Sequence, residues 1–165
     1  YDRNSQITRD FYGMVQNKFH YAITGKTAAE IIHESADHTK DNMGLATWEN
    51  APNGRILKSD VLVAKNYLSE TELKQLNRMV TAYLDFAEDM AERKIPLTMQ
   101  DWEKRLNSFI EMFDYNLLND SGKVSAEIAK IHAETEFEKY RIIQDRVFMS
   151  DFDRYILELE EKSKK

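Results

Sequence analysis

The sequence has no cysteine, only 5 glycines and 2 prolines, and no long apolar run. Without cysteine the chain can form neither a disulfide nor a thiolate metal site. The scarcity of helix-breaking residues favours helical structure. Because no apolar stretch reaches the ~20 residues that cross a bilayer, we expect no membrane contact and a cytoplasmic location. The net charge of −6 also argues against a dedicated nucleic-acid surface, which normally carries a basic excess.

The length and composition fit one folded domain. Of the 165 residues, 42% are apolar and 32% are charged, a mixture typical of a globular chain. The first residue is Tyr1 and not methionine, so we expect residues 1–165 to be the C-terminal part of a longer protein. Residues 151–165 are predicted to form a charged tail that frays or docks on a partner.

Start and stop signals predict about five to six helices. The first begins after Asn4 or Ser5 and ends at Gly25, because glycine tolerates a left-handed conformation. Three later helices are predicted to begin where a hydroxyl side chain precedes a carboxylate by three residues, because the two side chains can accept hydrogen bonds from unpaired backbone amides. These pairs are Thr27–Glu30, Ser69–Glu72 and Thr98–Asp101. We also predict a short helix over 61–68, capped by Ser59 or Asp60, and a last helix over about 124–144.

Between these helices lie a long loop and one regular apolar stripe. Residues 37–58 are predicted to form an irregular loop, fixed to the core by Met43, Leu45 and Trp48. An apolar stripe follows along 73–90, in which apolar residues are spaced alternately by three and four positions, a seven-residue repeat. Its members are Leu73, Leu76, Val80, Tyr83, Ala87 and Met90. This repeat is typical of a tightly packed helix pair or a coiled-coil seam. The sequence therefore predicts an all-α, single-domain helical bundle with one long irregular loop.

The histidines do not have the spacing of a helical metal site. His33 and His38 are five residues apart, whereas ligands on one helix face are three or four apart. A site joining His33 and Asp37 to the distant His20 or His132 is geometrically possible but has no support in the sequence. The Gly25-Lys26-Thr27 segment lacks the upstream glycine of a phosphate-binding loop. We predict no metal, no cofactor and no catalytic residue.

An alternative interpretation is a nucleotide- or metal-dependent enzyme domain, although the sequence favours a non-enzymatic function. Its site would lie between the first two helices and the 37–58 loop, where polar residues concentrate. The candidate cluster consists of Gln16, Asn17, His20, Lys26, Thr27, His33, Asn42 and Lys58.

Four stretches between about residues 11 and 131 together resemble the virulence-associated RhuM family of bacteria: "FYGMVQNKFHYAITGKTAAEII", "NMGLATW", "KSDVLVAKNYLSETELKQLNRMVTAYLDFAED" and "MQDWEKRL". The resemblance implies a preceding N-terminal half of DNA-binding type and no established catalytic residues. We therefore predict a C-terminal helical domain for oligomerisation or partner binding in a DNA-binding, virulence-associated protein. The 73–90 stripe would contact a second copy or another protein, and DNA would be contacted only through the absent N-terminal half.

Overall fold

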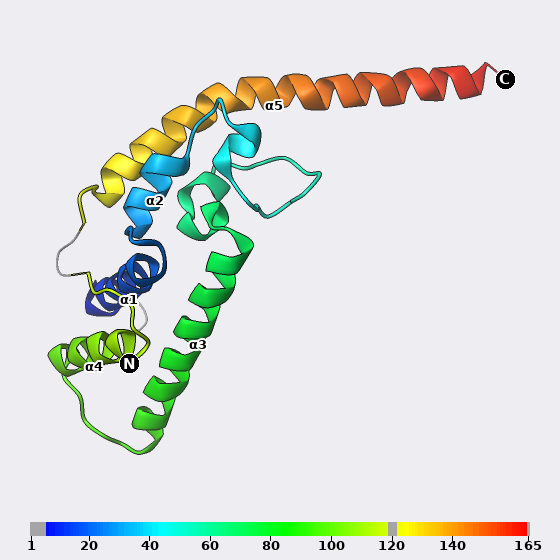
Figure 1. The fold of residues 1–165 in the computed structure, drawn as a ribbon. Helices are drawn as coiled ribbons and strands as arrows, with labels where there is room; N and C mark the ends of the chain where they lie inside the picture. The colour runs from blue at the N-terminus through cyan, green and yellow to red at the C-terminus, as the bar shows by residue number, and fades with distance from the viewer. Residues whose placement is uncertain (1–5, 119–121, 165) are drawn as a thin grey trace.

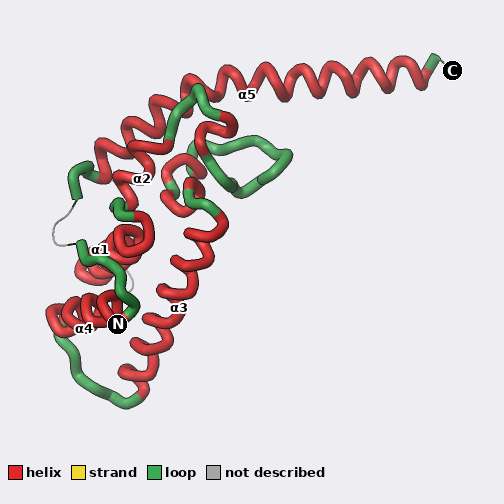
Figure 2. Tube along the Cα trace, viewed as in Figure 1, coloured by secondary structure: helices red, strands yellow, loops and turns green. Residues whose placement is uncertain are grey.

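The computed structural model describes residues 6–118 and 122–164, and this part of the chain is helical without a strand. In this part of the chain, five α-helices are joined by short 3-10 turns and loops (Figures 1 and 2). The helices are α1 (Gln6–Thr24), α2 (Ala28–Ser35), α3 (Glu70–Glu92), α4 (Met99–Met112) and α5 (Ala126–Ser163). The predicted all-α fold is confirmed.

The three predicted helix starts with a hydroxyl and a carboxylate three residues apart are confirmed. Thr27, Ser69 and Thr98 each accept a hydrogen bond from the amide three residues later. The carboxylate of that later residue accepts one from the backbone amide of the capping residue. Gly25 follows the end of α1 with a φ of 78°, a conformation that costs glycine little. The predicted caps Asn4 and Ser5 lie outside the described residues.

Part of the buried core lies where α1 contacts α3 and α4. Phe19 of α1 packs edge-to-face against Tyr83 of α3 at 5.8 Å and Phe109 of α4 at 6.3 Å between ring centroids. Leu76 and Met90 of the predicted stripe are also buried. The stripe thus contributes to the chain's own core. Each large apolar side chain that is buried there stabilises the fold by about 1.5–3 kcal/mol.

The long loop is fixed to the core as predicted, but the following segment differs from the prediction. Met43, Leu45 and Trp48 are all buried. Residues 61–68 form no single helix; they lie in two 3-10 turns, Asp60–Leu62 and Ala64–Tyr67. Ser59 makes no capping bond. The carboxylate of Asp60 accepts hydrogen bonds from the amides of Leu57 and Glu49 at 2.7 and 3.2 Å, and these bonds hold the loop.

The last helix is much longer than predicted. It was expected to end near Gln144, yet α5 continues to Ser163 without interruption, over 38 residues or ~57 Å. Its first half packs on α2 through Ala129, Ala133 and Phe137. Its second half extends away from the body of the molecule (Figure 1). The predicted charged tail, 151–165, is therefore helical as far as Ser163.

Candidate functional site

Three of the chain's four histidines lie along the contact between α2 and α5. His33 is on α2, His38 is in the turn that follows α2, and His132 is on α5. Glu136, one turn after His132, accepts hydrogen bonds from both the Nδ1 and the backbone amide of His38. Asp37 completes a group whose potential ligand atoms, with those of His38 and Glu136, all lie within 4.8 Å of one another. We call these three residues the Asp37–His38–Glu136 cluster.

Two further histidines border this cluster. The Nε2 of His132 donates a hydrogen bond to the carbonyl oxygen of Ala36 at 2.8 Å. Because a carbonyl oxygen can only accept, this ring nitrogen carries a proton. The ring of His33 lies 4.9 Å from that of His132 between centroids. The His132 bond therefore holds the backbone immediately before Asp37 against α5.

The carboxylates of the cluster are held in their charged forms. Hydrogen bonds from the hydroxyl and amide of Thr39, at 2.6 and 2.9 Å, lower the pKa of Asp37. Burial raises the pKa of Glu136, but the hydrogen bonds from His38 outweigh it and the net pKa is lowered. Both groups therefore offer anionic oxygens at neutral pH.

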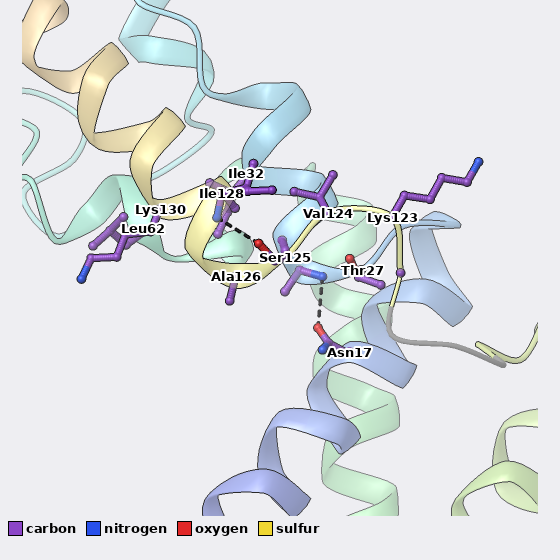
Figure 3. Close-up of a pocket in the computed structure, with 14 residues that line it drawn as sticks. Asn17, Thr27, Ile32, Leu62, Lys123, Val124, Ser125, Ala126, Ile128 and Lys130 are labelled. Atoms are coloured by element: carbon purple, nitrogen blue, oxygen red, sulfur yellow. Dashed lines mark hydrogen bonds between the residues drawn. The ribbon is translucent and has the colours of Figure 1, made fainter.

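A surface cavity of about 750 Å³ lies beside the start of α5, and Figure 3 shows the side chains that line it. The amide of Ala28 donates to Asn17 Oδ1 at 3.3 Å, and Ser125 caps α5 through the amide of Ile128. Most of the other lining side chains are apolar, and Lys123 points away from them (Figure 3). The cavity therefore offers a hydrocarbon surface with few polar groups.

The predicted polar cluster is distributed over several places. Asn17 and Thr27 line the 750 Å³ cavity, where the hydroxyl of Thr27 is occupied in capping α2. His20 is buried elsewhere, with Nδ1 donating to the carbonyl of Gln16 at 2.6 Å and Nε2 without a partner among the described residues. Burial, and to a lesser extent nearby Lys65, lower the pKa of His20.

The remaining predicted residues occupy separate surfaces. Lys26 forms an ion pair with Glu34 on the exposed side of α2, and the ring of His33 contacts that of His132 at a tilt of 48°. Asn42 lines a smaller hollow of about 240 Å³ between the loop and α5. Gln16 and Lys58 are exposed, and neither lines these two cavities.

The sequence-based prediction missed Glu136 and the contact of His38 with it. A signal did exist, because His132 and Glu136 are four residues apart on α5, the spacing that places two ligands on one helix face. Spacing along one helix gave no indication that the turn after α2 would reach them.

A polar clamp holds the loop against the middle of α5. The buried side chain of Gln144 accepts the Ile56 amide at 2.8 Å and donates to the Ile56 carbonyl at 3.0 Å. Arg55 beside it forms an ion pair with Asp145 and lies 4.7 Å from the centroid of the Phe148 ring. Beyond this clamp α5 leaves the body of the protein.

The projecting half of α5 carries large apolar side chains that the described chain leaves exposed. Their exposed fractions lie between 37 and 59%, at Val147, Met149, Phe152, Tyr155, Ile156, Leu157 and Leu159. Contiguous apolar surface on a soluble protein usually marks an interaction site. Across residues 6–118 and 122–164, no helix combines the length and the apolar character that a bilayer span requires.

Comparison with known proteins identifies the family. The model of the virulence protein RhuM family matches residues 1–149. Searches of curated proteins and of solved structures gave no match. The match spans most of the 165 residues and ends within the projecting half of α5. The chain therefore belongs to the virulence protein RhuM family.

Proposed function

We propose that this chain is a non-enzymatic interaction domain that pairs with a second copy of itself through the projecting half of α5. The observation that carries the proposal is the apolar face of that segment, most of which the described chain leaves exposed. In proteins, most of the stability of a helix comes from the packing of its apolar face. A partner for this face would therefore stabilise the helix itself.

The exposed face follows a regular pattern. Six residues are spaced by three, four, three, four and three positions, which places them on one side of the helix, at Asp145, Phe148, Phe152, Tyr155, Leu159 and Lys162. We call this set the α5 stripe. Met149 and Ile156 flank it and are also exposed. The stripe has a charge of opposite sign at each end and four large side chains between.

The order of these residues favours an antiparallel second copy. In that arrangement Phe148 lies opposite Leu159, Phe152 lies opposite Tyr155, and each Asp145 lies opposite a Lys162. A parallel pair would place Asp145 against Asp145 and Lys162 against Lys162, and like charges repel. The stripe is thus complementary to itself in one orientation only. Asp145 is about half exposed and already pairs with Arg55, so it can contact a further cation.

The available area is sufficient for such a pair. The large apolar side chains on this face leave on the order of 500 Å² exposed per chain, or on the order of 1,000 Å² for two copies, the size at which specific interfaces begin. The 240 Å³ hollow lined by Trp48, Pro52 and Phe148 lies at the base of the stripe. In the antiparallel arrangement it faces the tip of the partner's α5.

This proposal places the interface on α5, since much of the predicted 73–90 stripe is buried within the chain. DNA binding stays a proposal for a longer protein, in which a paired α5 would hold two DNA-binding halves together. The enzyme alternative has less support, because only Asn17 and Thr27 of its eight residues line the 750 Å³ cavity.

Light scattering coupled to size-exclusion chromatography tests the proposal. Two chains of 19.4 kDa give an expected mass near twice that value for the wild type. Phe152→Glu introduces a charge into the α5 stripe and should reduce the mass to that of one chain. Leu157→Glu is the matched control, since Leu157 is equally exposed on the same segment but lies off the stripe. A monomeric wild type, or equal effects of both substitutions, would contradict the proposal.

A charge exchange tests the orientation. Asp145→Lys and Lys162→Asp should each weaken pairing, because each places like charges opposite one another in the antiparallel arrangement. The double variant restores opposite charges and should recover the dimer. Failure of the double variant to recover, with both single variants folded by circular dichroism, would exclude this arrangement.

A further inference from the structure

We propose that Asp37, His38 and Glu136 form a binding site for a divalent transition-metal ion such as Zn²⁺. One imidazole nitrogen and two carboxylates supply ligand atoms within 4.8 Å of one another. A bound Zn²⁺ would take the place of the proton that His38 Nδ1 donates to Glu136, and this proton would be released to solvent. Each ligand atom would then lie about 2.0–2.2 Å from the ion. The site is independent of the α5 stripe and of the proposed pairing.

The backbone already holds the ligands in place. The Ala36 amide donates to the Ile32 carbonyl at 3.0 Å and ends α2, and the Lys40 amide donates to the Asp37 carbonyl at 3.1 Å in the turn that follows. The His38 amide donates to Glu136 at 3.2 Å and fixes this turn against α5. A site whose ligands are positioned in advance loses less conformational entropy on binding.

The neighbouring histidines support the geometry. His132 holds the Ala36 carbonyl, one residue before the first ligand, and lies one helical turn before Glu136. Hydrogen bonds outside the ligand shell orient the ligands of metal sites, and the His132 bond does so through the backbone next to Asp37. We infer that His132 is a positioning residue and that Glu136 is a ligand.

The donor set indicates the class of metal. Imidazole suits Zn²⁺ and other first-row transition metals, whereas Mg²⁺ and Ca²⁺ prefer oxygen ligands alone. Three protein ligands leave at least one coordination position open for water or another small ligand. Because the ligands come from both the turn after α2 and α5, metal binding would stabilise the contact between them.

Thermal unfolding of the full chain with added ZnCl₂ tests this proposal. A concentration a hundred times the Kd should raise the melting temperature by roughly 5–10 °C. Equal MgCl₂ or CaCl₂ should raise it much less, and EDTA should reverse the Zn²⁺ effect. Isothermal titration should give one Zn²⁺ per chain.

Variants locate the site. His38→Asn and Glu136→Gln should each weaken Zn²⁺ binding at least tenfold. The matched control Glu138→Gln removes an exposed carboxylate that pairs with Arg141 on the same helix, and it should bind Zn²⁺ like the wild type. Absence of a Zn²⁺-specific shift in the wild type would overturn the proposal. So would unchanged Zn²⁺ binding in both ligand variants, since the ion would then lie elsewhere, for example at His33 and His132. Titration does not depend on the variants' melting temperatures, so a destabilised variant remains informative.

Discussion

Replacing Gln144 by leucine should destabilise the protein more than removing the charged contacts around it. Gln144→Leu removes two hydrogen bonds to the buried backbone of Ile56. In one the Ile56 amide donates to the Gln144 side chain at 2.8 Å, and in the other that side chain donates to the Ile56 carbonyl at 3.0 Å. Each buried backbone group left without a partner costs about 1–3 kcal/mol. Because the loop can partly move into water, we expect a loss of about 2–4 kcal/mol in the free energy of unfolding.

The comparison variant is Arg55→Ala. It removes the ion pair with Asp145 and the contact with the ring of Phe148. Both charged side chains are about half exposed, so solvent screens the pair and we expect a loss below about 1 kcal/mol. The buried hydrogen bonds of Gln144 should therefore contribute more to the free energy of unfolding than the exposed contacts of Arg55.

Urea unfolding followed by circular dichroism measures both losses. Hydrogen exchange at the Ile56 amide supplies a local measurement, and Gln144→Leu should accelerate it far more than exchange within α3. The reasoning is refuted if Gln144→Leu costs no more than Arg55→Ala, or if the Ile56 amide stays equally protected.

Three further predictions concern Tyr83, His20 and Gly44. The Tyr83 hydroxyl has no hydrogen-bond partner among the described residues, so Tyr83→Phe should leave stability in urea unchanged or raise it by up to about 1 kcal/mol; a loss above that would reveal a partner. The lowered pKa of His20 means that the unfolded chain binds the proton more readily, so stability should fall as the pH drops below about 6.5. His20→Leu should flatten thermal stability against pH there, and an unchanged slope would contradict this. Gly44 has a φ of 82°, and a Cβ there would overlap the carbonyl oxygen of Ser35. Gly44→Ala should therefore lower the melting temperature by roughly 4–8 °C, whereas Gly13→Ala, at an open helical position, should not.

Local signals predicted the helix starts well because capping is a local interaction. The hydroxyl of Thr27 and the carboxylate of Glu30 need only each other and the intervening backbone. The end of α5 was mispredicted for the converse reason. The apolar pattern changes near Gln144, but no glycine or proline follows to stop the helix, so α5 continues to Ser163.

Periodicity predicted an apolar face on α3 but not the partner that covers it. Leu76 and Tyr83 are buried within their own chain. The sequence could not predict this, because an apolar stripe has the same spacing whether its own chain or a second chain covers it. The Asp37–His38–Glu136 cluster was beyond prediction for a related reason. His38 and Glu136 are 98 residues apart, and only tertiary packing of α2 on α5 brings them together.

The distance between the two α5 tips in solution tests the central claim most directly. The chain has no cysteine, so Ser163→Cys provides a single position for a nitroxide label, and pulsed electron paramagnetic resonance measures the label-to-label distance. An antiparallel pair centred between Phe152 and Tyr155 predicts roughly 30 Å between the labelled backbones. Labels roughly 10 Å apart, as in a parallel pair, would instead broaden the continuous-wave spectrum. Such broadening, or the absence of any dipolar signal at concentrations well above those used for light scattering, would contradict the account.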